Sequence, residues 1–472
     1  MQTKNGTQKE NKMGIMPIPR LVITMSFPIM ISMLVQSLYN IVDSIFVAKI
    51  SEDALTATSL AYSAQILQIA VAVGTGVGVN ALISRRLGAK KFEEANEAAT
   101  TGLVLTLASS LIFVLWGIFG TEIFIRQFST DENIVALGTT YLRICQVFSS
   151  GIFLGTLTQR LLQATGRTFS SMLAQLAGAV VNIILDPIMI FGLLGCPEMG
   201  IAGAAIATVI GQWAAAVIGL ILNYVQNKEI HFVFRSFRMK KESVKAIYKV
   251  GAPTILTQAM GSIMVAAMNV ILIMFSSTAV AFFGVYFKLQ SFLTMPMNGL
   301  GQGSLPIVGY NYGAGNAKRV KETCKTAISI GIGFGAAGLL IFMSFPAGLL
   351  GMFSASAAMI EIGVPALRII SVSFLILPVT MIIGYVISGL GNGMVNMMST
   401  AIRQLVLLVP CVFLLGKLGG IKAVWFAFWI AEAAAFVFAV FGLRKGLRKM
   451  EQNIAKNHVS KESGKGEKNL GE

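Results

Sequence analysis

Long apolar stretches separated by short polar breaks follow one another along almost the whole chain. Each stretch is long enough for a helix to cross the core of a bilayer, which takes about 20 residues. The breaks predict twelve spans, at 21–48, 54–84, 95–119, 133–160, 168–194, 201–225, 247–275, 279–310, 326–349, 359–389, 394–416 and 421–443. The pattern therefore predicts an all-α polytopic membrane protein with both termini on one side.

Composition and charge agree with this interpretation. The chain of 472 residues is 55% hydrophobic and 12% charged, whereas soluble chains are about 25% charged. Most Lys and Arg residues lie in the tails and in alternate breaks, and short basic loops stay in the cytoplasm. We therefore expect both termini to be cytoplasmic. The net charge of +16 then indicates contact with membrane lipid and no nucleic-acid partner.

The two halves of the chain repeat one another. Pro253, Gln290 and Gly391 follow Pro28, Gln65 and Gly166 at one constant separation. Six spans per half with unchanged polarity predict two parallel-repeat lobes, a plan typical of carriers that rock two lobes about a central site.

This repeat divides the chain into five parts. They are a cytoplasmic tail (1–20), an N-terminal six-helix lobe (21–227), a cytoplasmic linker (228–246), a C-terminal six-helix lobe (247–445) and a cytoplasmic tail (446–472). The last part is polar and poor in aromatic residues, which predicts disorder. The stretch 231–249 fits either an amphipathic helix on the inner leaflet or a solvated linker.

Two spans of the first lobe carry a polar face with a carboxylate near the outer end. The face of 21–48 holds Ser32, Gln36, Asn40 and Asp43, and that of 168–194 holds Ser171, Gln175, Asn182 and Asp186, all at helical spacing. A charged side chain inside a bilayer costs roughly 2.5 to 3.5 kcal/mol, so such residues are functional candidates.

The two carboxylates are expected at equal depth, where Asn40 and Asn182 lie one turn further in. Carboxylate and amide oxygens suit a proton or a small hard cation such as Na⁺. Burial and mutual repulsion favour the protonated form of one carboxylate, as reversible proton coupling requires. The alternative is that each Asp only bonds a neighbouring amide or hydroxyl group.

The sequence leaves open the roles of the charged residues in the second lobe. Glu432, about midway along span 421–443, either pairs with Arg403 as a structural ion pair or forms a second protonation site. Lys288 is expected to line a central cavity. The inward spans of this lobe hold polar residues such as Gln258 but no carboxylate, so carboxylate coupling would reside in the first lobe.

The 24 Met and 30 Phe residues suit promiscuous binding of flat apolar cations, because thioethers are flexible and aromatic faces attract cations. Both are also ordinary lipid-facing residues. The residues that we assign to a substrate cavity are Gln36, Gln175, Gln258, Met260, Phe287 and Lys288.

Three parts of the chain carry a family resemblance: "PIMISMLVQSLYNIVDSIFV" (28–47), "NIILDPIMIFG" (182–192) with "GIAGAAIATVIGQ" (200–212), and "GAPTILTQ" (251–258). They resemble the multidrug and toxic compound extrusion (MATE) family, in particular its bacterial MepA-like branch. The resemblance implies twelve helices in two lobes and coupling through Asp43, Asn182 and Asp186, with Thr208 as the candidate for a further hydroxyl of that site. It also implies a multi-pass protein of the bacterial plasma membrane. The second-lobe acidic residues of some members are not matched here.

The expected function is secondary active efflux of organic cations or dyes by antiport with H⁺ or Na⁺, by a monomer without other cofactor. The alternative within carriers is a lipid-linked oligosaccharide or polyisoprenoid flippase, whose cavity would be richer in Arg. A channel is a third class, but unequal polar lobes favour alternating access. An enzyme is not expected, because His231 and His458 lie outside the spans and no GxxxxGK[ST] motif is present.

Overall fold

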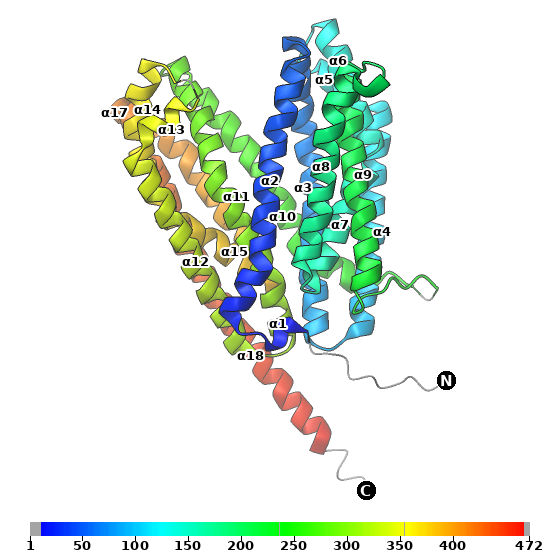
Figure 1. Ribbon diagram of the computed structural model, residues 1–472. Helices are drawn as coiled ribbons and strands as arrows, with labels where there is room; N and C mark the ends of the chain where they lie inside the picture. Colours follow the sequence, from blue (N-terminus) through cyan, green and yellow to red (C-terminus); the bar gives the residue numbers. More distant parts are fainter. Residues whose placement is uncertain (1–10, 236, 354, 467–472) are drawn as a thin grey trace.

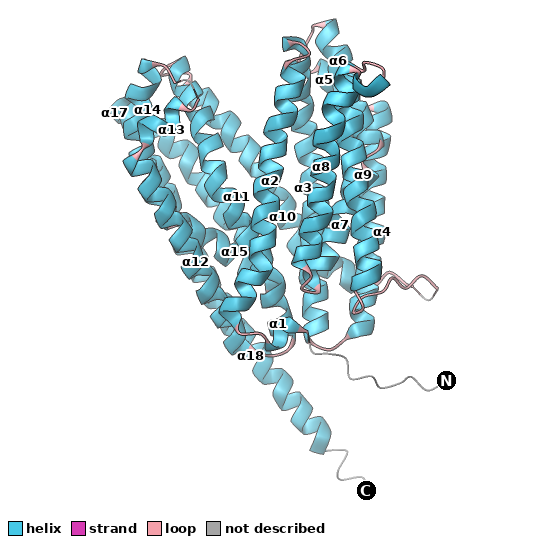
Figure 2. Ribbon diagram, viewed as in Figure 1, coloured by secondary structure: helices cyan, strands magenta, loops and turns pink. Residues whose placement is uncertain are grey.

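The computed structural model describes residues 11–235, 237–353 and 355–466, with their side chains except at 40, 41 and 456–466. All regular elements in these ranges are helices (Figure 2). Ten candidate membrane spans, counted over the described residues, are long and apolar enough to cross a bilayer. The two remaining expected spans are also helical, so the all-α polytopic fold is confirmed.

These two spans are less apolar or less regular than the others. The span 133–160 is broken into α6 (Glu132–Val147) and α7 (Ser150–Ala164). The span 279–310 lies in α11 (Ser277–Gly313), which carries Lys288 and Gln290 among its apolar residues.

The first group of helices runs from α1 to α9 (Figure 1). Besides α6 and α7 it contains α1 (Lys12–Ile15), α2 (Ile18–Ala48), α3 (Glu52–Gly88), α4 (Phe92–Phe119), α5 (Thr121–Arg126), α8 (Thr168–Phe191), a short 3₁₀ turn (Leu193–Gly195) and α9 (Gly200–Gln226). We call the end at which α1 lies the lower end, and the end at which α5 and α6 meet the upper end (Figure 1).

The second group runs from α10 to α18 (Figure 1). Besides α11 it contains α10 (Lys241–Leu272), α12 (Ala317–Ser344), α13 (Pro346–Gly351), α14 (Ala357–Ser371), a 3₁₀ turn η2 (Val372–Leu375), α15 (Leu377–Gly389), α16 (Met394–Ala401), a π-helical segment η3 (Ile402–Leu408), α17 (Val409–Val424) and α18 (Ala427–Gly466).

Local signals at helix ends are repeated in the two groups. The Ser51 and Ser276 hydroxyls cap α3 and α11 in the same way, each accepting from the backbone N–H three residues on at 3.0 Å. Gly166 and Gly391, each two residues beyond the last residue of α7 and α15, both adopt a positive φ. The repeat in the sequence is therefore a repeat in backbone conformation.

The two groups touch along helix crossings made by glycine. On α3, Gly74 faces the backbone of Gly251 in α10, so closely that neither has room for a side chain. On α11, Gly299 and Gly303 lie against α2 at Met30 and Ser26. Small residues let neighbouring helices approach closely in membranes. The ribbons diverge from these crossings towards the upper end (Figure 1).

A polar bond also joins the two groups. Arg160 of α7 is buried and donates to the Gln302 side-chain oxygen of α11 at 2.6 Å. At the position that corresponds to Arg160 in the second half, the Tyr385 hydroxyl donates to Asn298 at 3.0 Å. No carboxylate pairs with Arg160 within the described residues, and the amide oxygens of Gln163 and Gln302 accept its hydrogen bonds.

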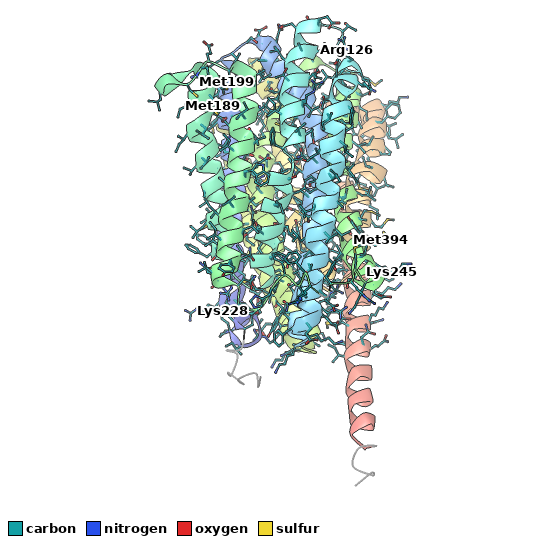
Figure 3. All side chains as sticks on the ribbon, turned by 90° about the vertical axis from the view of Figure 1, so that its right-hand side faces the viewer. Arg126, Met189, Met199, Lys228, Lys245 and Met394 are labelled. Atoms are coloured by element: carbon teal, nitrogen blue, oxygen red, sulfur yellow. The ribbon has the colours of Figure 1, made fainter. Side chains whose placement is uncertain are left out.

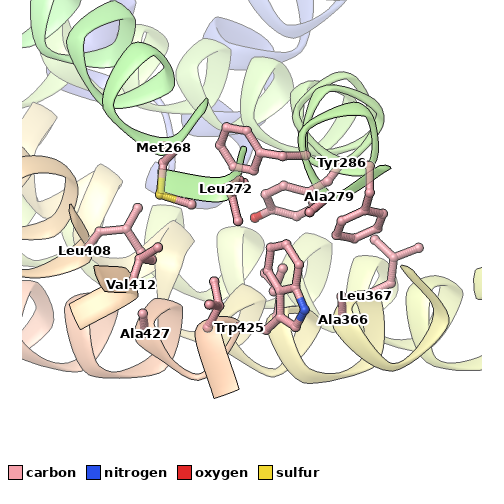
Figure 4. Close-up of a cluster of buried hydrophobic side chains, with 14 of the residues drawn as sticks. Met268, Leu272, Ala279, Tyr286, Ala366, Leu367, Leu408, Val412, Trp425 and Ala427 are labelled. Atoms are coloured by element: carbon pink, nitrogen blue, oxygen red, sulfur yellow. The ribbon is translucent and has the colours of Figure 1, made fainter. Parts of the chain in front are cut away.

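The second group has an extensive aromatic core near its upper end. Phe282 and Trp425 meet edge to face with ring centroids 5.0 Å apart, and Tyr286 meets Phe428 at 5.6 Å. Leu272, Val412 and Ala427 close around them (Figure 4). This core joins the start of α18 to α10, α11 and α17.

The tail prediction is wrong for residues 446–455, which continue α18 instead of being disordered. Met450 is buried against a cluster that includes Met13 and Val320, and Glu451 forms an ion pair with Lys321 of α12. These contacts hold residues 446–455 against the rest of the protein in spite of their polar composition. The segment from 456 is helical to Gly466, and 467–472 lie outside the described residues.

The connection between α9 and α10 is not a helix over the described residues 231–235 and 237–240, so the amphipathic-helix interpretation is wrong there. Its backbone is held against α4, where the His231 N–H donates to Asn96 and the Val233 N–H donates to Thr100. Figure 3 places Lys228 and Lys245 towards the lower end, and Arg126 and Met199 at the upper end.

Candidate cation-coupling site

Asp43 and Asp186 occupy matching places on two packed helices. Asp43 lies five residues before Ala48, where α2 ends, and Asp186 lies five residues before Phe191, where α8 ends. Both helices end at the upper end (Figure 1). At 1.5 Å per residue, both carboxylates lie about 8 Å below the helix ends.

The structure brings the two carboxylates together. Asp186 is fully buried and Asp43 is half-buried, and their carboxyl groups face each other closely enough to share a proton. Two ionised carboxylates at such a distance repel each other strongly when little water is present. The arrangement therefore favours a bound cation or proton between them.

Asn182 connects this pair to α9. Its side-chain N–H group donates to Asp186 Oδ1 at 3.1 Å and lies 3.5 Å from the Thr208 hydroxyl. Helical spacing places Asn182 one turn before Asp186, and close packing of α8 on α9, where Gly178 meets Gly211, brings Thr208 within reach. The position expected for Thr208 from the resemblance is thus beside Asn182.

Three buried oxygens of this group have no hydrogen-bond partner among the described residues: Asp43 Oδ1, Asn182 Oδ1 and Asp186 Oδ2. Unpaired buried polar atoms are rare and costly, and each needs a physical explanation. A set made only of oxygen acceptors has the chemistry of a site for H⁺ or for a hard cation.

The sequence interpretation missed the hydroxyl and amide groups that surround the pair. Tyr39 of α2 interacts with both carboxylates. Gln65 of α3 contacts Tyr141 and Cys145 of α6, and both of these side chains interact electrostatically with Asp43. For Tyr39 a signal was available, because it lies three residues after Gln36 and four before Asp43, on the same helical face. Gln65 and Tyr141 lie in other spans, where the only signal was a polar group inside an apolar stretch.

The other assigned residues are distributed more widely. Gln175 donates to Gln36 at 2.8 Å, so the polar faces of α8 and α2 meet a second time below the carboxylates. Gln258 and Phe287 are exposed on α10 and α11, as is Lys288, and Met260 is half-buried. The side chain of Asn40 lies outside the described part of the structure.

Glu432 and Arg403 are close to each other in the second group. Glu432 Oε2 lies 3.8 Å from Arg403 Nη1, which bears out their proximity. Glu432 is not midway along its span, because α18 begins at Ala427, only five residues earlier.

Comparison with known proteins identifies the family of the chain. The chain matches the MatE family over residues 28–188 and 253–414, one match in each half. The chain belongs to this family. MatE proteins are transporters without enzymatic activity, and the chain is accordingly a multi-pass membrane transport protein.

Relatives and solved structures within the MatE family cover nearly the whole chain. The multidrug export protein MepA of Staphylococcus aureus (strain MRSA252) is 27% identical over 438 residues, 91% of this chain and 95% of MepA. MepA of Staphylococcus saprophyticus is 26% identical, covering 89% and 93%. A multidrug resistance MATE transporter of the MOP superfamily in an outward-facing conformation is 26% identical with a TM-score of 0.89, covering 95% of this chain and all of that one.

Proposed function

We propose that this MatE protein is a secondary active multidrug efflux transporter that exports organic cations or dyes in exchange for H⁺ or Na⁺. The observation that carries the proposal is the pair Asp43 and Asp186, whose carboxyl groups face each other with unpartnered oxygens inside an apolar helix bundle. The names of the relatives support the substrate class.

The position of the pair suggests how ion binding acts on the lobes. Helix α2 carries Asp43 near its upper end and packs on α11 of the other lobe further down, at Ser26 and Met30. When a cation or proton binds between Asp43 and Asp186, the repulsion between α2 and α8 is removed. A displacement of α2 then changes the crossing with α11, which joins the two lobes.

Binding shifts the equilibrium between two states only if their affinities for the ion differ. In the arrangement described, the lobes are joined below and diverge above (Figure 1). With the basic lower end in the cytoplasm, this arrangement corresponds to an outward-facing state, in which the upper carboxylates accept an ion from outside and substrate leaves. The reverse state would release the ion inside. The bacterial MepA relatives support a place in the bacterial plasma membrane.

The function is tested by efflux of a fluorescent organic cation from proteoliposomes that contain the full chain, under an imposed pH gradient or an imposed Na⁺ gradient. The variant Asp43→Asn/Asp186→Asn removes both charges while keeping side-chain size. The control is Glu198→Gln, which removes an exposed carboxylate between α8 and α9.

We expect one gradient to drive efflux, the double variant to abolish it, and the control to keep it. The active gradient names the coupling ion. Normal gradient-driven efflux by the double variant would contradict coupling at this pair. Absence of efflux under both gradients with every cation tested would overturn the proposal and favour the lipid-linked flippase.

A further inference from the structure

A third carboxylate lies buried in the second lobe, outside the coupling pair. Glu432 of α18 is 5% exposed, and its Oε1 atom has no hydrogen-bond partner among the described residues. The hydroxyl of Tyr286, 1% exposed and electrostatically coupled to Glu432, is equally unpartnered. Two buried polar groups are thus left unsatisfied at one place.

The depth of Glu432 matches that of the first-lobe pair. It follows the start of α18 at the upper end by five residues, whereas Asp43 and Asp186 precede the upper ends of their helices by five. In the repeat, α18 corresponds to α9, and α16, η3 and the start of α17 together correspond to α8. The second lobe therefore carries charged residues between the same pair of helices that holds Asn182 and Thr208 in the first.

The contact with Arg403 is not a closed structural ion pair. Well-formed charge-assisted hydrogen bonds are about 2.7 to 2.9 Å long, and the exposed pair of Arg126 with Glu132 reaches 2.8 Å. Arg403 and Glu432 are 3.8 Å apart although Glu432 is buried. A buried ion pair is stable only if geometry is good and the remaining lone pairs are bonded. Here the contact is long, and Glu432 Oε1 has no hydrogen-bond partner among the described residues.

The backbone next to the pair is also irregular. Arg403 lies in the π-helical segment η3, between the α-helical turns of α16 and α17. Such π-bulges occur frequently at functional sites. The Arg403 side chain is 20% exposed, so its guanidinium has a route out of the cluster, whereas the Glu432 side chain is 6% exposed.

We propose that Glu432, together with Tyr286 and Arg403, is a second proton-binding site of this transporter. A proton taken up from water binds to the Glu432 carboxylate and neutralises it. Arg403 keeps its own charge, loses its partner and turns towards its exposed side. Loss of the proton restores the pair.

The surroundings of Glu432 are well defined. The charged or titratable side chains that interact with it, within the described residues, are Arg403 of η3 and Tyr286 of α11. Thr380 of α15 adds a hydroxyl group beside the carboxylate. Apolar side chains around Tyr286, including Leu272 and Trp425, exclude other charges (Figure 4). The role of this site in transport rests on the proposed function, but proton binding itself can be measured without transport.

The test is pH-difference infrared spectroscopy of the full chain in nanodiscs, which detects the C=O stretch of protonated carboxyl groups. The starting variant is Asp43→Asn/Asp186→Asn, so that the first-lobe pair gives no signal. Glu432→Gln is added to it, and Glu361→Gln, which changes an exposed carboxylate of α14, is the matched control.

We expect a carboxyl band that appears on acidification, is lost with Glu432→Gln and remains with Glu361→Gln. A spectrum that Glu432→Gln leaves unchanged would overturn the proposal and make the pair a permanent ion pair. Should Glu432→Gln fail to fold because Arg403 is left unpaired, Glu432→Gln/Arg403→Gln gives the same reading. Failure of the proposed function appears separately, as absent efflux by the unaltered chain.

Discussion

Asn182 connects two helices of the site, because its amide group contacts both Asp186 of α8 and Thr208 of α9. The two contacts differ in strength. The bond to the carboxylate is 3.1 Å long, whereas the one to the hydroxyl is at the limit of a hydrogen bond, at 3.5 Å. The residues of this site should therefore respond to substitution to different degrees.

We expect Asn182→Leu to reduce ion-driven efflux by roughly 10- to 100-fold, because a hydrogen bond to a charged group contributes about 1.5 to 3 kcal/mol. Thr208→Val should change efflux only a few-fold. The measurement is the initial rate of efflux from proteoliposomes at equal protein content. A larger loss with Thr208→Val than with Asn182→Leu would show that the hydroxyl is the principal ligand.

At this scale the sequence predicted the charged residues and missed their surroundings. A carboxylate inside an apolar span is costly, so Asp43 and Asp186 stand out without any structure. Tyr39, Gln65 and Tyr141 do not, because tyrosine and glutamine inside a span have many structural uses. Tyr39 lies one helical turn before Asp43 in α2, whereas Tyr141 comes from α6, which packs on α3, and interacts with both Asp43 and Gln65.

At the scale of the helices, the packing of α3 depends most clearly on glycine. Gly78 lies against the Ile247 carbonyl group of α10, with no space for a side chain. In α10 itself, Gly261 has no atom within 4 Å of the position of an added Cβ. The same substitution should thus have opposite effects at these two positions.

We expect Gly78→Ala to lower the melting temperature of the purified protein, because the backbone of α10 must move away. Gly261→Ala should be neutral or stabilising by up to about 1 kcal/mol, since alanine favours helix over glycine. Thermal unfolding in detergent measures both. Equal melting temperatures for the two variants would contradict the close crossing of α3 and α10.

The continuation of α18 below the membrane makes a second prediction at this scale. Met450→Ala should destabilise the protein by about 2 to 5 kcal/mol, the range for large-to-small substitutions in cores. The neighbouring exposed Lys449→Ala should have little effect. Thermal unfolding again decides, and a negligible effect of Met450→Ala would mean that this part of α18 is not docked.

The sequence predicted the positions of most elements, since an apolar run of bilayer length has few alternatives to a helix. It did not predict the extension of α18, because the segment is polar overall, although Leu447, Met450 and Ile454 lie at helical spacing. Their burial needs a cluster that includes Met13 and Val320, which come from distant parts of the chain. The π segment at Arg403 likewise has no local sequence signal.

At the scale of the whole molecule, the charge asymmetry predicts its orientation. Lys228 lies at the lower end and Arg126 at the upper end (Figure 3). In a variant with all four cysteines replaced by alanine, we expect Lys228→Cys to react with a membrane-impermeant thiol reagent only after cells are opened. Arg126→Cys should react in intact cells. The reverse pattern would invert the proposed direction of transport.

The repeat is the property of the whole molecule that the sequence predicted best, because aligned pairs such as Gly166 and Gly391 report a shared backbone conformation. The domain boundaries assigned from it remain a prediction. The relative angle of the two lobes had no signal in the sequence, since the same contacts are compatible with more than one angle.

The glycine crossings between α3 and α10 and between α2 and α11 have a mechanical consequence. On the glycine side of each crossing there is no side chain that must change its rotamer when the lobes turn, and only side chains of the facing helix, such as Ile255 and Met30, touch it. Such a joint can open and close many times with little internal friction. The resistance to opening is then concentrated in individual polar bonds, above all the one between Arg160 and Gln302, and the strength of that bond should set how long the lower side stays shut in each cycle.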